Sequence, residues 1–134
     1  MGLLSGKRPA NLGVRNGSLK AAPSSPNAVS SQATGDYQQI APLVYKSSPE
    51  QAMKALKAIV DSTPNTRIVE TKPDYLYAEY TSALLGFVDD VEFYFPRDGD
   101  IIHVRSASRL GRSDFGVNRK RIETIRAKLA QAGV

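Results

Sequence analysis

The stretch VDDVEFYFPRDGDIIHVRSAS, residues 88–108, decides the fold that we predict for this chain. Two runs rich in β-branched and aromatic residues, 88–96 and 101–108, flank a turn that contains Asp98-Gly99. Asp-Gly is a favoured sequence for a tight hairpin turn because it tolerates a left-handed backbone. The stretch therefore predicts an antiparallel hairpin.

The two faces of this predicted hairpin differ in polarity. Pairing about the turn places Phe93 opposite Val104 on an apolar face, which turns polar where Asp89 meets Ser108. A slip of one residue would exchange the faces, so the pattern fixes the register. The other face pairs Tyr94 with His103, Glu92 with Arg105 and Asp90 with Ala107. We expect that face, with Asp90 and His103, to lie toward solvent.

The rest of the chain supplies two helices and three further strands. We predict a strand at 40–45, a helix after Ser48 that ends before 63, strands at 66–71 and 75–81, the hairpin, and a helix at about 116–132. The buried side of the last helix should hold Val117, Ile122, Ile125, Leu129 and Ala132 at helical spacing. This order predicts an α+β fold, β-α-β-β-β-β-α, with a curved antiparallel sheet and both helices on one face. It is the topology of the TATA-binding-protein-like fold, an analogy that carries no function.

Residues 1–39 have few large apolar side chains and many Pro, Ser, Asn and Gly residues. This composition is typical of an irregular segment, which we call the arm. We predict that the folded domain spans 40–134. The arm either packs along that domain or is partly disordered, since a structureless segment of this length is unusual in a compact protein.

Composition limits the chemistry available to the chain. It has 134 residues, enough for one domain, and carries 18 basic against 13 acidic residues. The basic surplus lies entirely in 97–134, which points to an anionic ligand or partner. There is no cysteine and only one histidine, which excludes a disulfide and a thiolate or His-rich metal site. No Walker-type loop is present, and we expect no cofactor.

The sequence also bears on the membrane and the compartment. No apolar run approaches the ~20 residues that span a bilayer, so we expect no membrane span. No signal peptide is visible after Met1. The expectation is either a cytoplasmic protein or an exported one whose leader has been removed.

The candidate site is the segment 105–123, RSASRLGRSDFGVNRKRIE, which joins the last strand to the last helix. Guanidinium groups suit carboxylate or phosphate, and a helix N-terminus attracts anions. We predict an anion-receptive surface for a small anionic ligand or for an acidic group of a partner protein. Its binding residues are Arg105, Ser106, Ser108, Arg109, Arg112, Ser113, Asp114, Asn118 and Arg119, with Asp89 and Asp90 in support.

A structural interpretation of the same residues stays open. Asp114 can cap the last helix, since Asp accepts hydrogen bonds from the free N–H groups of a first turn. Arg105 has a cross-strand ion-pair partner in Glu92. Asp89 and the serines could consume the remaining donors in an internal network.

The function that fits best is a non-catalytic binding or assembly module that acts as a monomer. A hydrolase is one alternative, but Ser106 and His103 lie on opposite faces of one strand and form no nucleophile–base pair. Nucleic-acid binding is a second alternative. It is disfavoured because Phe115 is the only aromatic ring among the arginines, whereas single-strand platforms interleave aromatic and basic residues.

Five segments resemble the family called domain of unknown function 1499, and the likeness is greatest to its cyanobacterial and plastid members. They are NLG at 11–13, SSPN at 24–27, VSSQ at 29–32, GFVDDVEF at 86–93 and the segment 105–123. The resemblance implies no particular activity. It does imply two cysteines flanking SSPN, where this chain has Ala22 and Ala28, a natural or engineered paired replacement. Any redox role of that pair is missing here, and the resemblance leaves open an exported, periplasmic or lumenal, protein.

Overall fold

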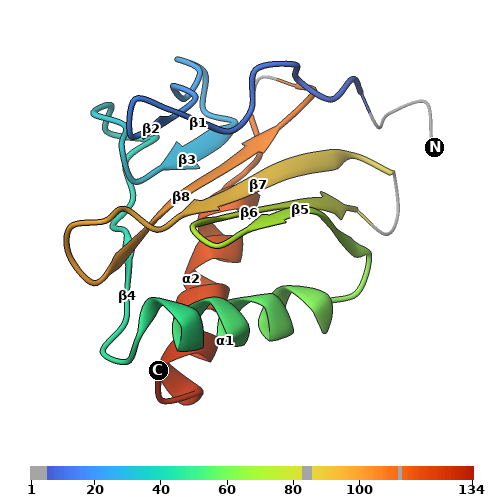
Figure 1. The fold of residues 1–134 in the computed structure, drawn as a ribbon. Helices are drawn as coiled ribbons and strands as arrows, with labels where there is room; N and C mark the ends of the chain where they lie inside the picture. The colour runs from blue at the N-terminus through green and yellow to red at the C-terminus, as the bar shows by residue number, and fades with distance from the viewer. Residues whose placement is uncertain (1–5, 83–85, 112) are drawn as a thin grey trace.

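A computed structural model describes residues 6–82, 86–111 and 113–134. Within these ranges the chain forms a six-stranded sheet, a small two-stranded ribbon and two helices, an α+β fold (Figure 1). The elements are β1 (Val14–Arg15), β2 (Ser18–Leu19), β3 (Ala28–Ser30), β4 (Leu43–Val44), α1 (Pro49–Asp61), β5 (Thr66–Lys72), β6 (Tyr75–Thr81), β7 (Val88–Tyr94), β8 (Ile101–Ser108) and α2 (Val117–Gln131).

The predicted hairpin is confirmed together with its register. β7 pairs antiparallel with β8, and Asp89 lies opposite Ser108. Phe93 faces Val104, and both side chains are fully buried. Gly99 adopts φ +86°, the left-handed conformation that the turn requires and that glycine accepts without a steric cost.

The sheet has the order β3-β8-β7-β6-β5, and neighbouring strands are antiparallel. Both helices cover one of its faces and the arm with its β1–β2 ribbon covers the other, so the molecule has three layers (Figure 1). The main core lies between the sheet and the helices. It includes Leu56 of α1, Leu76 of β6 and Ile122 of α2.

Both helices begin as local chemistry dictates. Ser48 Oγ accepts a hydrogen bond of 3.1 Å from the backbone N–H of Gln51, and Pro49 opens α1. α2 buries the predicted residues Ile122, Ile125 and Leu129. Val117 and Ala132 are exposed instead, because they lie at the two ends of α2, beyond the part that packs on the sheet.

The first predicted strand, 40–45, is shorter than expected. β4 holds only Leu43–Val44, which pairs with Ile102 and Ile101 of β8. Pro42 has no N–H group to donate, and the carbonyls of Ala41 and Pro42 accept hydrogen bonds from Arg126 of α2. The segment before Leu43 is therefore tied to the helix layer.

The arm packs along the domain, the first of the two outcomes left open. Its strand β3 pairs with β8, with Ala28 opposite Ala107 and Ser30 opposite Arg105. The next residue, Ser31, donates its N–H to the carbonyl of Val104, and β4 then continues along the same strand. The outer edge of β8 is thus covered almost along its length.

The expectation of a solvent-facing side of the hairpin is wrong. Asp90 is 1% exposed, Glu92 is fully buried and Arg105 is 3% exposed. The arm explains this, since Leu19 packs on Tyr75 and Tyr77 of the same sheet face.

Within the described ranges, no helix is long and apolar enough to cross a membrane.

Candidate anion-binding site

Charged and phenolic side chains gather on the arm-covered face of the sheet. The strand register aligns them, since Tyr77 lies opposite Glu92, Glu79 opposite Asp90, and Glu92 opposite Arg105. All three carboxylates have arginine neighbours: Arg8 and Arg109 at Glu79, Arg109 at Asp90, and Arg105 at Glu92. The sheet thus has a second, polar interior.

Arg109 is fully engaged in this interior. Its Nε and Nη2 donate to the two carboxylate oxygens of Asp90 at 2.9 and 2.8 Å, and Nη2 also reaches Glu79 at 2.5 Å. The hydrogen bonds to Asp90 raise the pKa of this guanidinium further above its usual value. The side chain is 3% exposed. The sequence predicted an open anion receptor at Arg109, whereas the structure pairs its charge with the carboxylates of Asp90 and Glu79.

At Glu79, burial and hydrogen bonding act in opposite directions on the pKa. Burial alone would raise the pKa of its carboxyl group, but hydrogen bonds from Arg8 and Arg109 outweigh burial and lower it. Arg8 comes from the arm and donates to Glu79 Oε2 at 2.7 and 3.0 Å. This contact helps to fasten the start of the arm to β6.

Arg105 is bound much more loosely. Its Nη1 lies 3.8 Å from Glu92 Oε1, and its Nη2 donates to the carbonyl of Ala21 over 3.5 Å. Its Nε has no hydrogen-bond partner among the described residues. Burial lowers the pKa of this guanidinium. A buried cation with so few close contacts has donors to spare for a ligand.

Glu92 explains why Arg105 is left under-coordinated. Its Oε2 accepts hydrogen bonds from the backbone N–H of Gly13 at 2.7 Å and from the hydroxyl of Tyr75 at 2.5 Å. Burial, with Glu92 beside it, raises the pKa of Tyr75, which stays a donor. Oε2 is thus held by the arm and β6, whereas Oε1 has no hydrogen-bond partner among the described residues and lies 3.8 Å from Arg105 Nη1.

A hollow of about 280 Å³ opens beside Arg105, between the arm and the sheet. We call it the arm-covered hollow. Its charged lining residues are Lys7, Lys20, Arg105, Arg109 and Asp90, and Asp90 is already paired with Arg109. Among the described residues, no carboxylate oxygen lies within 4.0 Å of the ammonium group of Lys7 or Lys20. The hollow is therefore positively charged.

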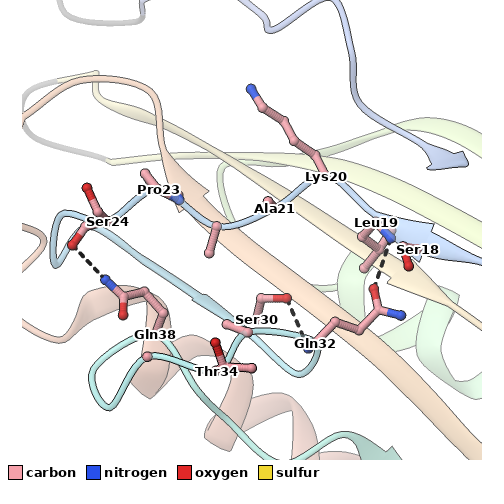
Figure 2. Close-up of a pocket in the computed structure, with 13 residues that line it drawn as sticks. Ser18, Leu19, Lys20, Ala21, Pro23, Ser24, Ser30, Gln32, Thr34 and Gln38 are labelled. Atoms are coloured by element: carbon pink, nitrogen blue, oxygen red, sulfur yellow. Dashed lines mark hydrogen bonds between the residues drawn. The ribbon is translucent and has the colours of Figure 1, made fainter.

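A larger hollow of about 520 Å³ lies within the arm (Figure 2). Its polar groups satisfy one another: Gln32 accepts from the N–H of Leu19, and Gln38 donates to the carbonyl of Ser24. Figure 2 shows Lys20 extending away from these neutral side chains. Lys20 also lines the arm-covered hollow, so the two spaces adjoin.

Five further predicted site residues form an internal network at the start of α2. Asn118, fully buried, accepts a hydrogen bond of 2.6 Å from Ser106 and donates to Asp114 at 2.7 Å and to Ser108 at 3.0 Å. Arg121 completes the network through Asp89 at 2.8 Å. These donors and acceptors are consumed within the protein, which is the structural alternative that the sequence left open.

The carboxylate of Asp114 occupies the N-terminus of α2. The N-cap residue is Gly116, and Asp114, two residues before it, accepts from the backbone N–H of Gly116 at 2.9 Å and from that of Asn118 at 3.3 Å. Tyr37 of the arm adds a hydroxyl donor at 2.6 Å. Burial opposes ionisation, but these hydrogen bonds together lower the pKa of Asp114.

The remaining predicted residues are dispersed. Arg119 donates to the carbonyls of Tyr37 and Gln39. Ser113 is exposed and accepts from the N–H of Phe115 at 3.3 Å. Arg112 lies outside the described residues. Of the predicted residues that the structure describes, only Arg105, Arg109, Ser108 and Asp90 therefore line the arm-covered hollow.

Sequence reasoning missed Lys7 and Lys20, because nothing in an irregular arm shows which strand it will cover. It also missed a contact of 3.0 Å between Ser31 Oγ and His103 Nδ1. Ser31 Oγ accepts a hydrogen bond from the N–H of Val104 at 2.8 Å, so its first role is to complete the edge of β8.

Among the described residues, no group of three or more His, Cys, Asp or Glu side chains is placed to hold a metal ion.

These features define an α+β domain with a polar interior beneath its N-terminal arm. The family described as "Protein of unknown function (DUF1499)" matches residues 18–129, and the chain belongs to that family. The match includes the arm from β2 onward as well as the sheet and α2 as far as Leu129. No curated protein matches the chain.

Proposed function

We propose that this protein is a non-catalytic binding module that holds a small anion, a carboxylate or a phosphate, in the arm-covered hollow. The observation that carries the proposal is the buried guanidinium of Arg105, whose contacts are long and whose Nε has no partner among the described residues. An anion that accepts from Arg105 would complete its coordination. Lys7 and Lys20 supply further positive charge at the same hollow.

This proposal moves the anion-receptive surface of 105–119 from the exposed loop to the space beneath the arm. A guanidinium in a poorly solvated site binds carboxylate or phosphate more strongly than an exposed one, because water competes less. Binding also links the arm to the sheet, since Lys20 belongs to the first and Arg105 to the second. We expect the free and bound proteins to be monomers.

Binding fits the contacts better than catalysis does. Ser106 Oγ is buried and donates to Asn118, so it has no base to activate it. The hydrolase alternative has one contact in its favour, Ser31 with His103, but the described residues place no carboxylate on that imidazole. Broad ester and phosphoester substrates should show no turnover that either Ser31→Ala or Ser106→Ala abolishes.

The experiment is a calorimetric titration with inorganic phosphate and with acetate at low ionic strength. We expect saturable binding to the native protein that weakens as salt is added. Lys20→Ala should weaken it by roughly threefold to tenfold, the effect of losing about 1 kcal/mol. Arg105→Lys should weaken anion binding as well, because lysine keeps the positive charge but lacks the paired N–H donors of a guanidinium.

Lys54→Ala is the matched control, because Lys54 is an exposed lysine on α1 and lines no described hollow near the arm. Its affinity should equal that of the native protein. The absence of saturable binding, or equal losses in Lys20→Ala and Lys54→Ala, would refute the proposal. Sedimentation of each variant would show in parallel whether the protein remains a monomer.

A further inference from the structure

Among the described residues, four large apolar side chains are exposed around a single hollow at one end of the sheet. They are Phe87, Leu110, Phe115 and Val117. All four line a space of about 450 Å³ between the ends of β6, β7 and β8 and the start of α2. Exposed apolar side chains that surround a concavity are typical of a binding surface.

Phe115 is the most exposed of them, at 94%. Its backbone adopts φ 53°, a left-handed conformation that is unfavourable for a bulky side chain. Gly116 follows with φ 81°, and Asp114 fixes the turn by accepting the N–H of Gly116. The fold thus holds an aromatic ring in water at a cost in backbone energy, which indicates a use for the ring.

A second hollow of about 310 Å³ adjoins the first and shares Tyr80, Val117 and Arg121 with it. Its charged lining residues are Lys120, Arg121 and Lys128. Arg121 is paired with Asp89, whereas the described residues place no carboxylate within 4 Å of either lysine. The two hollows form one groove, apolar at one end and basic at the other, which we call the docking groove.

We propose that the docking groove binds an extended acidic segment of a partner protein. One large apolar side chain of that segment enters the hollow beside Phe115, and two carboxylates face Lys120 and Lys128. The lysines are eight positions apart on α2, so they are separated by about 12 Å along the helix axis. An extended chain rises about 3.3 Å per residue, so its two acidic residues stand three or four positions apart.

The geometry favours this occupant over two others. A flat bilayer surface would reach the protruding ring of Phe115 but would leave unfilled the concavity that Phe87, Leu110 and Val117 line. A fatty acid carries one anionic group, whereas the groove presents two separated cations. Ser108 is the one described residue that lines both the docking groove and the arm-covered hollow, so the two proposals can fail independently.

The test is selection from a phage-displayed library of short random peptides on the immobilised full-length protein. We expect enrichment of peptides with one aromatic or leucine residue and two acidic residues three or four positions apart. Enriched peptides are then synthesised, labelled and titrated by fluorescence polarisation. Vesicles with and without phosphatidylserine, and a labelled fatty acid, are titrated in parallel.

Three substitutions decide the outcome. Phe115→Asn removes the ring while retaining a residue that tolerates left-handed backbone, and should weaken peptide binding about tenfold or more. Lys120→Glu and Lys128→Glu should each weaken it about tenfold, and peptides with lysine in place of the acids should regain affinity for these variants. Lys54→Glu, an exposed charge reversal on α1 away from the groove, should leave affinity unchanged.

Failure to enrich any peptide, or enrichment of peptides without spaced acids, would overturn the proposal. So would peptide affinity that is equal in the native protein and in Phe115→Asn. Saturable binding of phosphatidylserine vesicles or of the fatty acid, with none of the peptides, would assign the groove to a lipid instead. A circular-dichroism melt of each variant confirms that it is folded before it is titrated.

Discussion

Ser106 of β8 donates a hydrogen bond of 2.6 Å to Asn118 of α2, and both residues are fully buried. The contact joins the last strand to the last helix at the point where the chain has just reversed. The amide nitrogen of Asn118 also lies 3.1 Å from the carbonyl of Asn27 in the arm, so its two N–H groups are shared among Asn27, Ser108 and Asp114. One amide therefore holds the sheet, the helix layer and the arm together.

Asn118→Ala should be strongly destabilising. It leaves the buried hydroxyl of Ser106 without its acceptor, whereas Asp114 keeps Tyr37 and Gly116 and the carbonyl of Asn27 keeps the N–H of Ser108. Loss of a partner at a buried polar group costs about 1–3 kcal/mol. We expect the free energy of unfolding, from urea denaturation, to fall by about 1–3 kcal/mol. Thr124→Ala, on the same helix but exposed, should change it by less than about 0.5 kcal/mol. A loss as small in Asn118→Ala as in Thr124→Ala would show that the network contributes little.

Phe115→Asn should make the protein more stable. The ring is 94% exposed, so its removal forfeits little packing, and asparagine tolerates a left-handed φ better than phenylalanine does. We expect the free energy of unfolding to rise by up to about 1 kcal/mol. A variant that gains stability while it loses peptide binding cannot owe that loss to misfolding. A decrease in stability would mean that the ring packs in solution.

Acid should unfold the protein through Asp114 and Glu79. The pKa of each carboxyl is lowered in the folded state, so the unfolded chain binds protons more readily. Their contribution to stability is present above the ordinary pKa values, 3.8 and 4.5, and is lost as pH falls through the lower folded values. Urea midpoints measured across this range should fall steeply, and less steeply in Asp114→Asn. Identical pH profiles for the two proteins would exclude Asp114 as a contributor.

Ala22→Cys combined with Ala28→Cys should tighten the arm. Closure of so short a loop stabilises by roughly 2 kcal/mol in the chain-entropy model, provided that the disulfide forms without strain. We expect slower hydrogen exchange across 14–36 in the oxidised double variant than in the native protein. The reduced double variant is the control. Equal exchange in the oxidised and reduced forms would show that these positions do not act as a pair.

The register of β7 and β8 could be predicted because it depends on local signals. Asp98-Gly99 sets the turn, and the alternation of apolar and polar residues sets which side chains share a face. The alternation does not show, however, which face of the hairpin is exposed to solvent. Asp90 and Glu92 were expected in solvent because nothing in a Pro- and Ser-rich arm signals that it will cover them.

The candidate site was harder to predict for the same reason. Arg105 and Arg109 are four positions apart on one face, yet Arg109 is neutralised by two carboxylates while Arg105 lacks close partners. That difference depends on the hydrogen bonds by which Gly13 and Tyr75 hold the carboxylate of Glu92. These are tertiary contacts that no local sequence pattern indicates. β3 was missed because three residues are too few to show an alternating pattern.

The pairing of the arm with β8 and α2 also constrains how the chain can fold during synthesis. The carbonyl of Asn27 and the amide of Asn118 that donates to it are 91 positions apart. A ribosome that adds about 5–20 residues per second completes that interval in roughly 5–20 s. Throughout that interval the arm has been synthesised while the strand and helix that it binds are incomplete. Docking of the arm therefore waits for β8 and α2, and we expect its open backbone groups to be accessible to chaperones until these elements emerge.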